Sequence, residues 1–116
     1  MVRTQWYEAV RRFFETYDYW ILPTAQLFPF DVALDWPHEI AGRKMATYHE
    51  WMKVVVPVTF SGCPALAAPA GFGPAGLPIG IQIVAANHRE RDCLELGHAY
   101  DRRTNWVKRS PPALLA

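Results

Sequence analysis

Apolar side chains recur at helical spacing near the start of the chain, with charged side chains between them. Residues three, four, seven, eight and eleven positions after the first fall on one stripe of an α-helix. The pattern predicts an amphipathic helix over residues 4–17, with Thr4 as its N-cap. The stripe is wide and aromatic, so we expect it to cover another layer. It consists of Trp6, Ala9, Val10, Phe13, Phe14 and Tyr17.

A second helical period runs over residues 43–56. Pro57 is expected to end this helix, because proline lacks an N–H and clashes with the preceding turn. One face of the predicted helix carries Met45, Tyr48, Trp51, Met52 and Val55.

A third helix is predicted over residues 88–104, where Asn87 and Glu90 have the spacing of a capping box. Gly97 lies on its inner stripe. Because glycine in a helix costs about 1 kcal/mol relative to alanine, we expect this helix to approach a neighbouring hairpin closely. The inner stripe consists of Cys93, Leu96, Gly97 and Tyr100.

Three short apolar runs predict strands. Residues 19–22 are apolar on both faces, which is typical of a buried strand. Residues 65–70 and 79–86 flank a segment rich in glycine and proline, which favours an antiparallel hairpin. The chain therefore predicts an α/β fold, with a mixed sheet of about three strands, a C-terminal β-hairpin and three covering helices.

The remaining segments have no clear period. Residues 24–42 are expected to form a long loop across the face of the domain, because proline and glycine punctuate them. Residues 108–116 are expected to form a surface tail. By its length the chain, 1–116, is expected to be a single domain.

Composition narrows the function classes. Hydrophobic residues make up 51% of the chain, which is enough for a core. The net charge of +1 offers no field to hold nucleic acid or an anionic membrane, so neither is an expected partner. No apolar run approaches the roughly 20 residues of a membrane span. No signal peptide is recognised, and two cysteines indicate reduced thiols in a cytoplasmic protein.

Several patterns resemble cofactor or metal sites without their structural context. The segment Gly71–Gly76 matches G-x-G-x-x-G, but it leads into a predicted strand, whereas a dinucleotide site needs a helix there. The four histidines lack metal-ligand spacing. Asp31 and Asp35 are expected to be solvated loop acids. No metal or organic cofactor is therefore expected.

Cys63 and His49 are a conceivable thiol nucleophile and base. Cys63, however, lies between Gly62 and Pro64 without a neighbouring charge to lower its pKa. A small apolar contact at a chain bend is the favoured interpretation.

Three stretches in a fixed order resemble the carboxy-terminal part of the amidase-signature family of hydrolases. That family cleaves carbon–nitrogen amide bonds with a Ser, a second Ser and a Lys, without a cofactor. This chain has only two serines, Ser61 and Ser110, and no Gly-Ser-Ser run. The resemblance implies no catalytic residue here, and a partial amidase-signature fold. The stretches are Tyr17–Thr24, Val56–Ala65 and Gly76–Val84.

The resemblance also implies that these elements complete a larger sheet and line one side of a substrate pocket. In the family, Asn is usual where Thr59 stands here. Gln82 is expected to bond neighbouring backbone rather than substrate. The implied substrate-binding residues form an apolar wall, which favours an aryl or alkyl amide. They are Thr24, Trp51, Met52 and Val55.

Three hypotheses follow. The first is a C-terminal amidase fragment, inactive alone, with a sheet edge or face that requires the upstream catalytic part or self-association into an oligomer. The second is a non-catalytic module that binds a ligand or a protein. The third is a small cysteine hydrolase built on Cys63.

Overall fold

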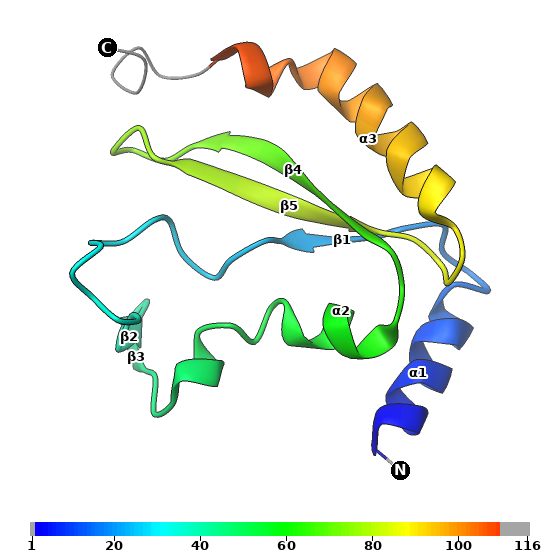
Figure 1. Cartoon of the computed structure of the whole chain (residues 1–116), viewed down its shortest axis with the longest axis horizontal. Coiled ribbons are helices and arrows are strands. Elements are labelled where there is room, and N and C mark those ends of the chain that lie inside the picture. The colour runs from blue at the N-terminus through cyan, green and yellow to red at the C-terminus, as the bar shows by residue number, and fades with distance from the viewer. Residues whose placement is uncertain (1, 110–116) are drawn as a thin grey trace.

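The computed structural model describes residues 2–109, and the part of the predicted tail beyond them lies outside the described residues. Figure 1 shows the elements in chain order. The α-helices are α1 (Val2–Phe13), α2 (Val56–Ser61) and α3 (Glu90–Thr104), with 3₁₀ turns η1 (Tyr48–Glu50) and η2 (Trp106–Arg109). The strands are β1 (Trp20–Pro23), β2 (Glu39–Ile40), β3 (Arg43–Lys44), β4 (Ala65–Phe72) and β5 (Pro78–Val84).

The main sheet has three antiparallel strands in the order β1-β5-β4. The predicted hairpin is confirmed as β4 and β5. Its tip is closed by a hydrogen bond from Gly73 N–H to the Leu77 carbonyl, 2.8 Å long, and Gly76 adopts a φ of +73° that favours glycine. The G-x-G-x-x-G segment is therefore a hairpin turn. The α/β class with a three-stranded main sheet is confirmed, but the sheet is antiparallel throughout and not mixed as predicted.

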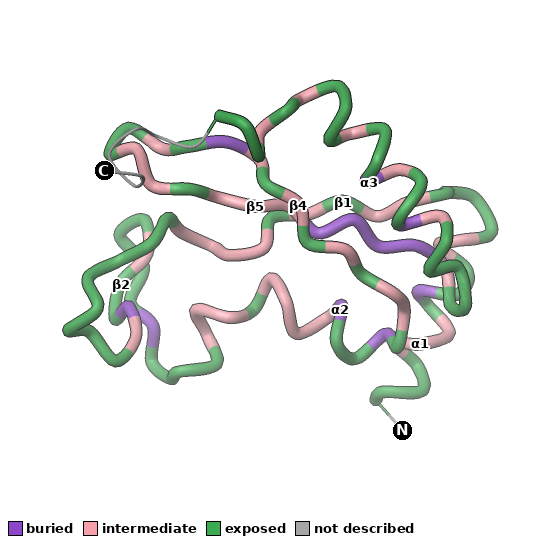
Figure 2. The backbone as a smooth tube through the Cα atoms, turned by 45° about the horizontal axis from the view of Figure 1, so that its top comes forward, coloured by how far each residue is buried: buried purple, intermediate pink, exposed green. Residues whose placement is uncertain are grey.

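The best-packed region lies between β5 and α3. Ile83, Val84 and Ala85 are at most 1% exposed, and Cys93 of α3 is 3% exposed. Gly97 lies so close to β4 that a side-chain carbon there would collide with Leu66 Cδ2. The predicted close approach of this helix to the hairpin is therefore confirmed, and Figure 2 shows the continuous buried stretch of β5.

The predicted first helix is confirmed as α1, which packs near α2 on the other side of the strands from α3 (Figure 1). Val10 is buried, and the Trp6 Nε1–H donates to the Pro57 carbonyl at 2.8 Å. The predicted N-cap was wrong: α1 already includes Val2, so Thr4 lies within the helix. The apolar stripe is only partly covered, because Tyr17 is 57% exposed.

The predicted second helix was wrong. Lys44 pairs with Glu39 in the small β2–β3 hairpin, and turns connect η1 to α2. Pro57 does not end a helix; it lies in the first turn of α2. Its missing N–H is unneeded there and its fixed φ suits helix initiation, so the same residue starts a short helix.

Two smaller predictions were also wrong. β1 is not buried on both faces, because Ile21 is 53% exposed at the edge of the sheet. α3 has no capping box at Asn87 and Glu90: its N-cap is Arg89, without a side-chain cap bond. Arg89 instead forms an ion pair with Asp92 at 2.6 Å.

The molecule is a thin slab, with extents of 45 × 40 × 18 Å. Its radius of gyration is 16.2 Å, against about 13 Å for a compact domain of this length. Its accessible surface is 8487 Å², against roughly 6,400 Å² for a compact monomer of this mass. The excess of roughly 2,000 Å² means that the chain covers its own surface less completely than a compact monomer does.

Candidate substrate-binding site

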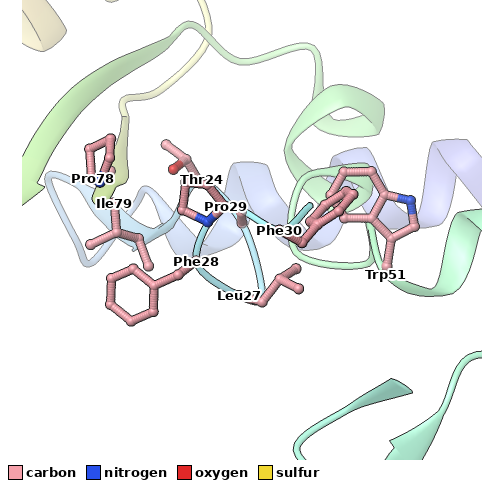
Figure 3. A pocket seen from close by; sticks show the side chains of 10 residues that line it. Thr24, Leu27, Phe28, Pro29, Phe30, Trp51, Pro78 and Ile79 are labelled. Carbon is pink, nitrogen blue, oxygen red and sulfur yellow. The ribbon is translucent and has the colours of Figure 1, made fainter. Parts of the chain in front are cut away.

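An open cavity of about 310 Å³ lies where the end of β1, the following loop and the start of β5 meet. Figure 3 shows aromatic and aliphatic side chains that converge on it. No lining residue carries a formal charge. The lining residues are Thr24, Ala25, Leu27, Phe28, Pro29, Phe30, Trp51, Pro78, Ile79 and Gly80.

The strand end that forms one wall is held by backbone and amide hydrogen bonds. Thr24 N–H donates to the Gly80 carbonyl at 2.9 Å, which extends the β1–β5 ladder by one residue. Gln82 is 8% exposed, and its Nε2 donates to the Pro23 carbonyl at 2.8 Å and to the Val54 carbonyl at 3.5 Å. The expectation that Gln82 satisfies neighbouring backbone is therefore confirmed.

The other wall is the loop that follows β1. Phe28 packs over the hairpin tip, where a side-chain carbon at Gly73 would lie 2.7 Å from its ring. Phe30 meets Trp51 edge-to-face, with ring centroids 5.8 Å apart. Such aromatic pairs contribute about 0.5–1.5 kcal/mol beyond their buried area, so the loop is fixed at both ends of the cavity.

The structure brings together two of the four predicted site residues. Thr24 and Trp51 line the cavity, whereas Met52 and Val55 are half-buried in the turns before α2 and do not line it. Sequence reasoning missed the loop residues Leu27, Phe28 and Phe30. Their signal was a cluster of aromatic and proline residues directly after a strand, without any period.

Polar atoms are scarce in the cavity. The Thr24 hydroxyl lines it and makes no hydrogen bond within residues 2–109. The Trp51 Nε1–H is buried without a partner in the same range, but it points away from the other lining side chains in Figure 3. The cavity therefore suits an uncharged, largely apolar group with one hydrogen-bonding function.

The serine and the two cysteines within residues 2–109 have burial and hydrogen bonds that indicate structural roles. Ser61 is fully buried; its hydroxyl donates to the Val58 carbonyl at 2.6 Å and accepts from the Cys63 N–H at 3.1 Å. Cys63 is half-buried and shares no hydrogen bond with His49. Burial raises the pKa of the Cys93 thiol, which disfavours the thiolate that a nucleophile needs.

Neither a metal site nor a membrane-spanning helix occurs within residues 2–109. No group of three or more His, Cys, Asp or Glu side chains is arranged there to hold a metal ion. None of the helices in that range has the length and apolarity needed to cross a bilayer.

Comparison with known proteins identifies the family, because the Amidase family model matches residues 1–94. The chain belongs to the amidase family. It is 34% identical over 110 residues to a glutamyl-tRNA(Gln) amidotransferase subunit from Microcystis aeruginosa (strain NIES-843), and the alignment covers 95% of this chain and 22% of the relative.

Two solved structures share the fold. A bacterial aryl acylamidase of the amidase-signature family superposes with a TM-score of 0.80 at 26% identity, over 91% of this chain and 22% of that one. A protein of a vestigial complex related to an s-triazine catabolic enzyme gives 0.78 at 30%, over 89% and 22%. The chain thus spans about a fifth of the length of these relatives and matches the C-terminal part of the curated one.

Proposed function

We propose that this chain supplies the C-terminal sheet and one pocket wall of an amide-hydrolysing enzyme whose catalytic groups come from the upstream amidase part. One observation carries the proposal: about nine-tenths of the chain superposes on an amidase, yet it covers 22% of that enzyme. Within residues 2–109 the serine is Ser61, which is buried and donates its hydroxyl to the Val58 carbonyl inside α2. It is therefore not available as a nucleophile, and we propose that the chain alone is inactive.

Both faces of the sheet have uncovered ends that support such a partner. Ile21 lies opposite Ile83 on the face that α3 covers, but α3 leaves Ile21 53% exposed. On the other face, Ala65 and Ala67 of β4 are exposed. Contiguous exposed apolar surface marks a contact site, and these residues lie on the two edge strands of the sheet, β1 and β4.

A groove between α1 and α2 adds to this surface. It encloses about 480 Å³, and apolar side chains form all of its lining except Arg3. Val2 is 80% and Phe60 52% exposed there. The catalytic part is the proposed occupant of these surfaces, and self-association is their proposed fate in its absence.

The proposed substrate is an uncharged amide that carries an aryl or alkyl group. The cavity supports this, because Phe28, Phe30 and Ile79 line it and no charged side chain does. Met52 and Val55 would then act from behind the wall rather than in contact with substrate. A cytoplasmic location without a nucleic-acid partner is supported by the net charge of +1 and two free cysteines.

Complementation in trans tests the proposal. The chain is mixed with the M. aeruginosa relative lacking its own matching C-terminal segment, and hydrolysis of acetanilide and of glutamine amide is followed. We expect co-elution and hydrolysis by the mixture only. Amide hydrolysis by this chain alone, or no association with the catalytic part, would contradict the proposal. Phe60→Asp, in the α1–α2 groove, should abolish co-elution.

A further inference from the structure

Thr24 and Gly80 face each other in the cavity, and the missing side chain of Gly80 leaves space for the Thr24 hydroxyl. Thr24 lies directly opposite Gly80 at the end of the β1–β5 ladder, joined by the 2.9 Å hydrogen bond. A side-chain carbon at Gly80 would lie 2.9 Å from Thr24 Oγ1 and 3.2 Å from Thr24 Cγ2. The threonine side chain therefore rests on the bare backbone of Gly80.

The space over Gly80 is limited from the other side too. The same side-chain carbon would lie 3.1 Å from the carbonyl oxygen of Ala68, which belongs to β4 and cannot rotate away. No positive φ constrains Gly80. Glycine is needed at this position for space, and not for an unusual backbone conformation.

The Thr24 hydroxyl is also the one side-chain polar group that the cavity offers to a ligand. The other polar lining group, the Trp51 indole N–H, is buried and turned away (Figure 3). A hydroxyl can donate or accept, so it can bond either the carbonyl oxygen or the N–H of an amide. A charged group would find no counter-ion among the lining side chains.

We infer that Gly80 and Thr24 together determine specificity: Gly80 sets the depth of the cavity floor, and the Thr24 hydroxyl on that floor selects a neutral aryl amide over an aryl hydrocarbon. That such an amide is also the substrate rests on the proposed function. The binding site itself belongs to this chain and is tested without the catalytic part.

The experiment measures binding of acetanilide and of toluene to the full 116-residue chain by ¹H–¹⁵N NMR titration, with thermal melting to establish folding. The wild-type chain should bind both probes, with shifts at the Thr24 and Gly80 amides. Thr24→Val keeps the shape and removes the hydroxyl, so it should weaken acetanilide binding about fivefold and leave toluene binding unchanged, as expected for one neutral hydrogen bond. Thr24→Ser is the matched control and should retain the preference for acetanilide.

The size of the floor is tested separately. Gly80→Ala should weaken both probes at least tenfold, because Thr24 must move into the cavity. The double variant Gly80→Ala/Thr24→Ala removes both Thr24 contacts and should recover part of the toluene binding, since the contact with the Ala68 carbonyl remains, while acetanilide binding stays weak.

Three outcomes would overturn the inference: equal acetanilide affinity in the wild-type and Thr24→Val chains, unchanged binding in a folded Gly80→Ala chain, or a folded wild-type chain that binds neither probe. Failure of the proposed function is distinguishable, since it is read from complementation and turnover. Complementation without probe binding defeats this inference alone.

Discussion

Two isoleucines that face each other in the sheet have opposite environments. Ile83 of β5 is 1% exposed, whereas its register partner Ile21 of β1 is 53% exposed. Both lie on the face that α3 covers. α3 contacts β4 and β5 but has no comparable contact with β1. Ile21 is therefore more exposed than Ile83 because α3 does not extend over β1.

The comparison extends to whole regions. The α3–β5 side has a core with nearly complete burial, held also by Cys93, whose Sγ lies 3.4 Å from the Ile83 carbonyl. The α1–α2 side has Val10 and Val58 buried but leaves Val2 and Phe60 exposed. The first region has a core that its own residues bury, whereas the second has the apolar residues of a core without a layer that covers them.

The largest effect should come from truncating the buried isoleucine. Ile83→Ala should destabilise the chain by about 2–5 kcal/mol, because it removes buried methyl groups and leaves a cavity. Ile21→Ala is the matched control, with an expected cost below about 1 kcal/mol. Urea unfolding followed by circular dichroism measures both. Equal losses for the two variants would show that the exposure difference has no energetic meaning.

An intermediate effect is expected at the side-chain amide of Gln82, which bonds the backbone of β1 and of the turn before α2. Gln82→Leu should cost about 0.5–1.5 kcal/mol, because the hydrogen bond to the Pro23 carbonyl is lost and that carbonyl lies on an exposed residue that water can reach. Gln26→Leu is the control, since Gln26 makes one longer bond, 3.3 Å to the Glu50 carbonyl. If Gln82→Leu unfolds at the same urea concentration as wild type, the amide does not join β1 to β5.

Local sequence patterns predicted the well-buried region, formed by β4, β5 and α3, well. Alternation and a glycine-rich turn were enough for the hairpin, and helical period was enough for α3, because each element is formed by neighbouring residues. Gly97 even indicated the contact with β4. Family resemblance, and not periodicity, led to Thr24 and Trp51.

The part of the chain between β1 and β4 was predicted less well, for physical reasons. Pro57 is compatible with either end of a helix, and the sequence pattern alone does not distinguish the two; in the structure it lies in the first turn of α2, where the Trp6 indole donates to its carbonyl. Of the residues predicted on one helical face before it, Met45 follows β3, Tyr48 lies in η1, and the others lie in turns. The loop wall at Phe28 depends on the bare backbone of Gly73, a long-range contact that no local pattern encodes.

A smaller effect tests the close packing of α3. Gly97→Ala should destabilise the chain, since its methyl group meets Leu66. In a Leu66→Ala background the same change should stabilise by about 1 kcal/mol, the difference in helix propensity. Thermal melting of the four chains measures the coupling. Equal effects of Gly97→Ala in both backgrounds would contradict the contact.

The smallest effect should be local and pH-dependent. Glu50 Oε2 accepts a 2.6 Å hydrogen bond from the Ala46 N–H, and this bond, helped by Lys53, lowers the pKa of Glu50 below its usual 4.5. A lowered pKa means that the ionised carboxylate stabilises the folded turn. That contribution is complete above the ordinary pKa and is lost as the pH falls through the folded value.

Amide exchange followed by NMR therefore separates the two regions once more. On going from about pH 6 to about pH 3, the Ala46 amide should lose protection beyond the intrinsic pH dependence of exchange, while the Ile83 and Val84 amides keep theirs. Glu50→Gln should show the acid behaviour already at the higher pH, because a neutral amide is a weaker acceptor than a carboxylate. If Ala46 stays protected in acid, the carboxylate does not hold this turn. If β5 loses protection together with Ala46, the turn at residues 46–50 does not open independently of the sheet.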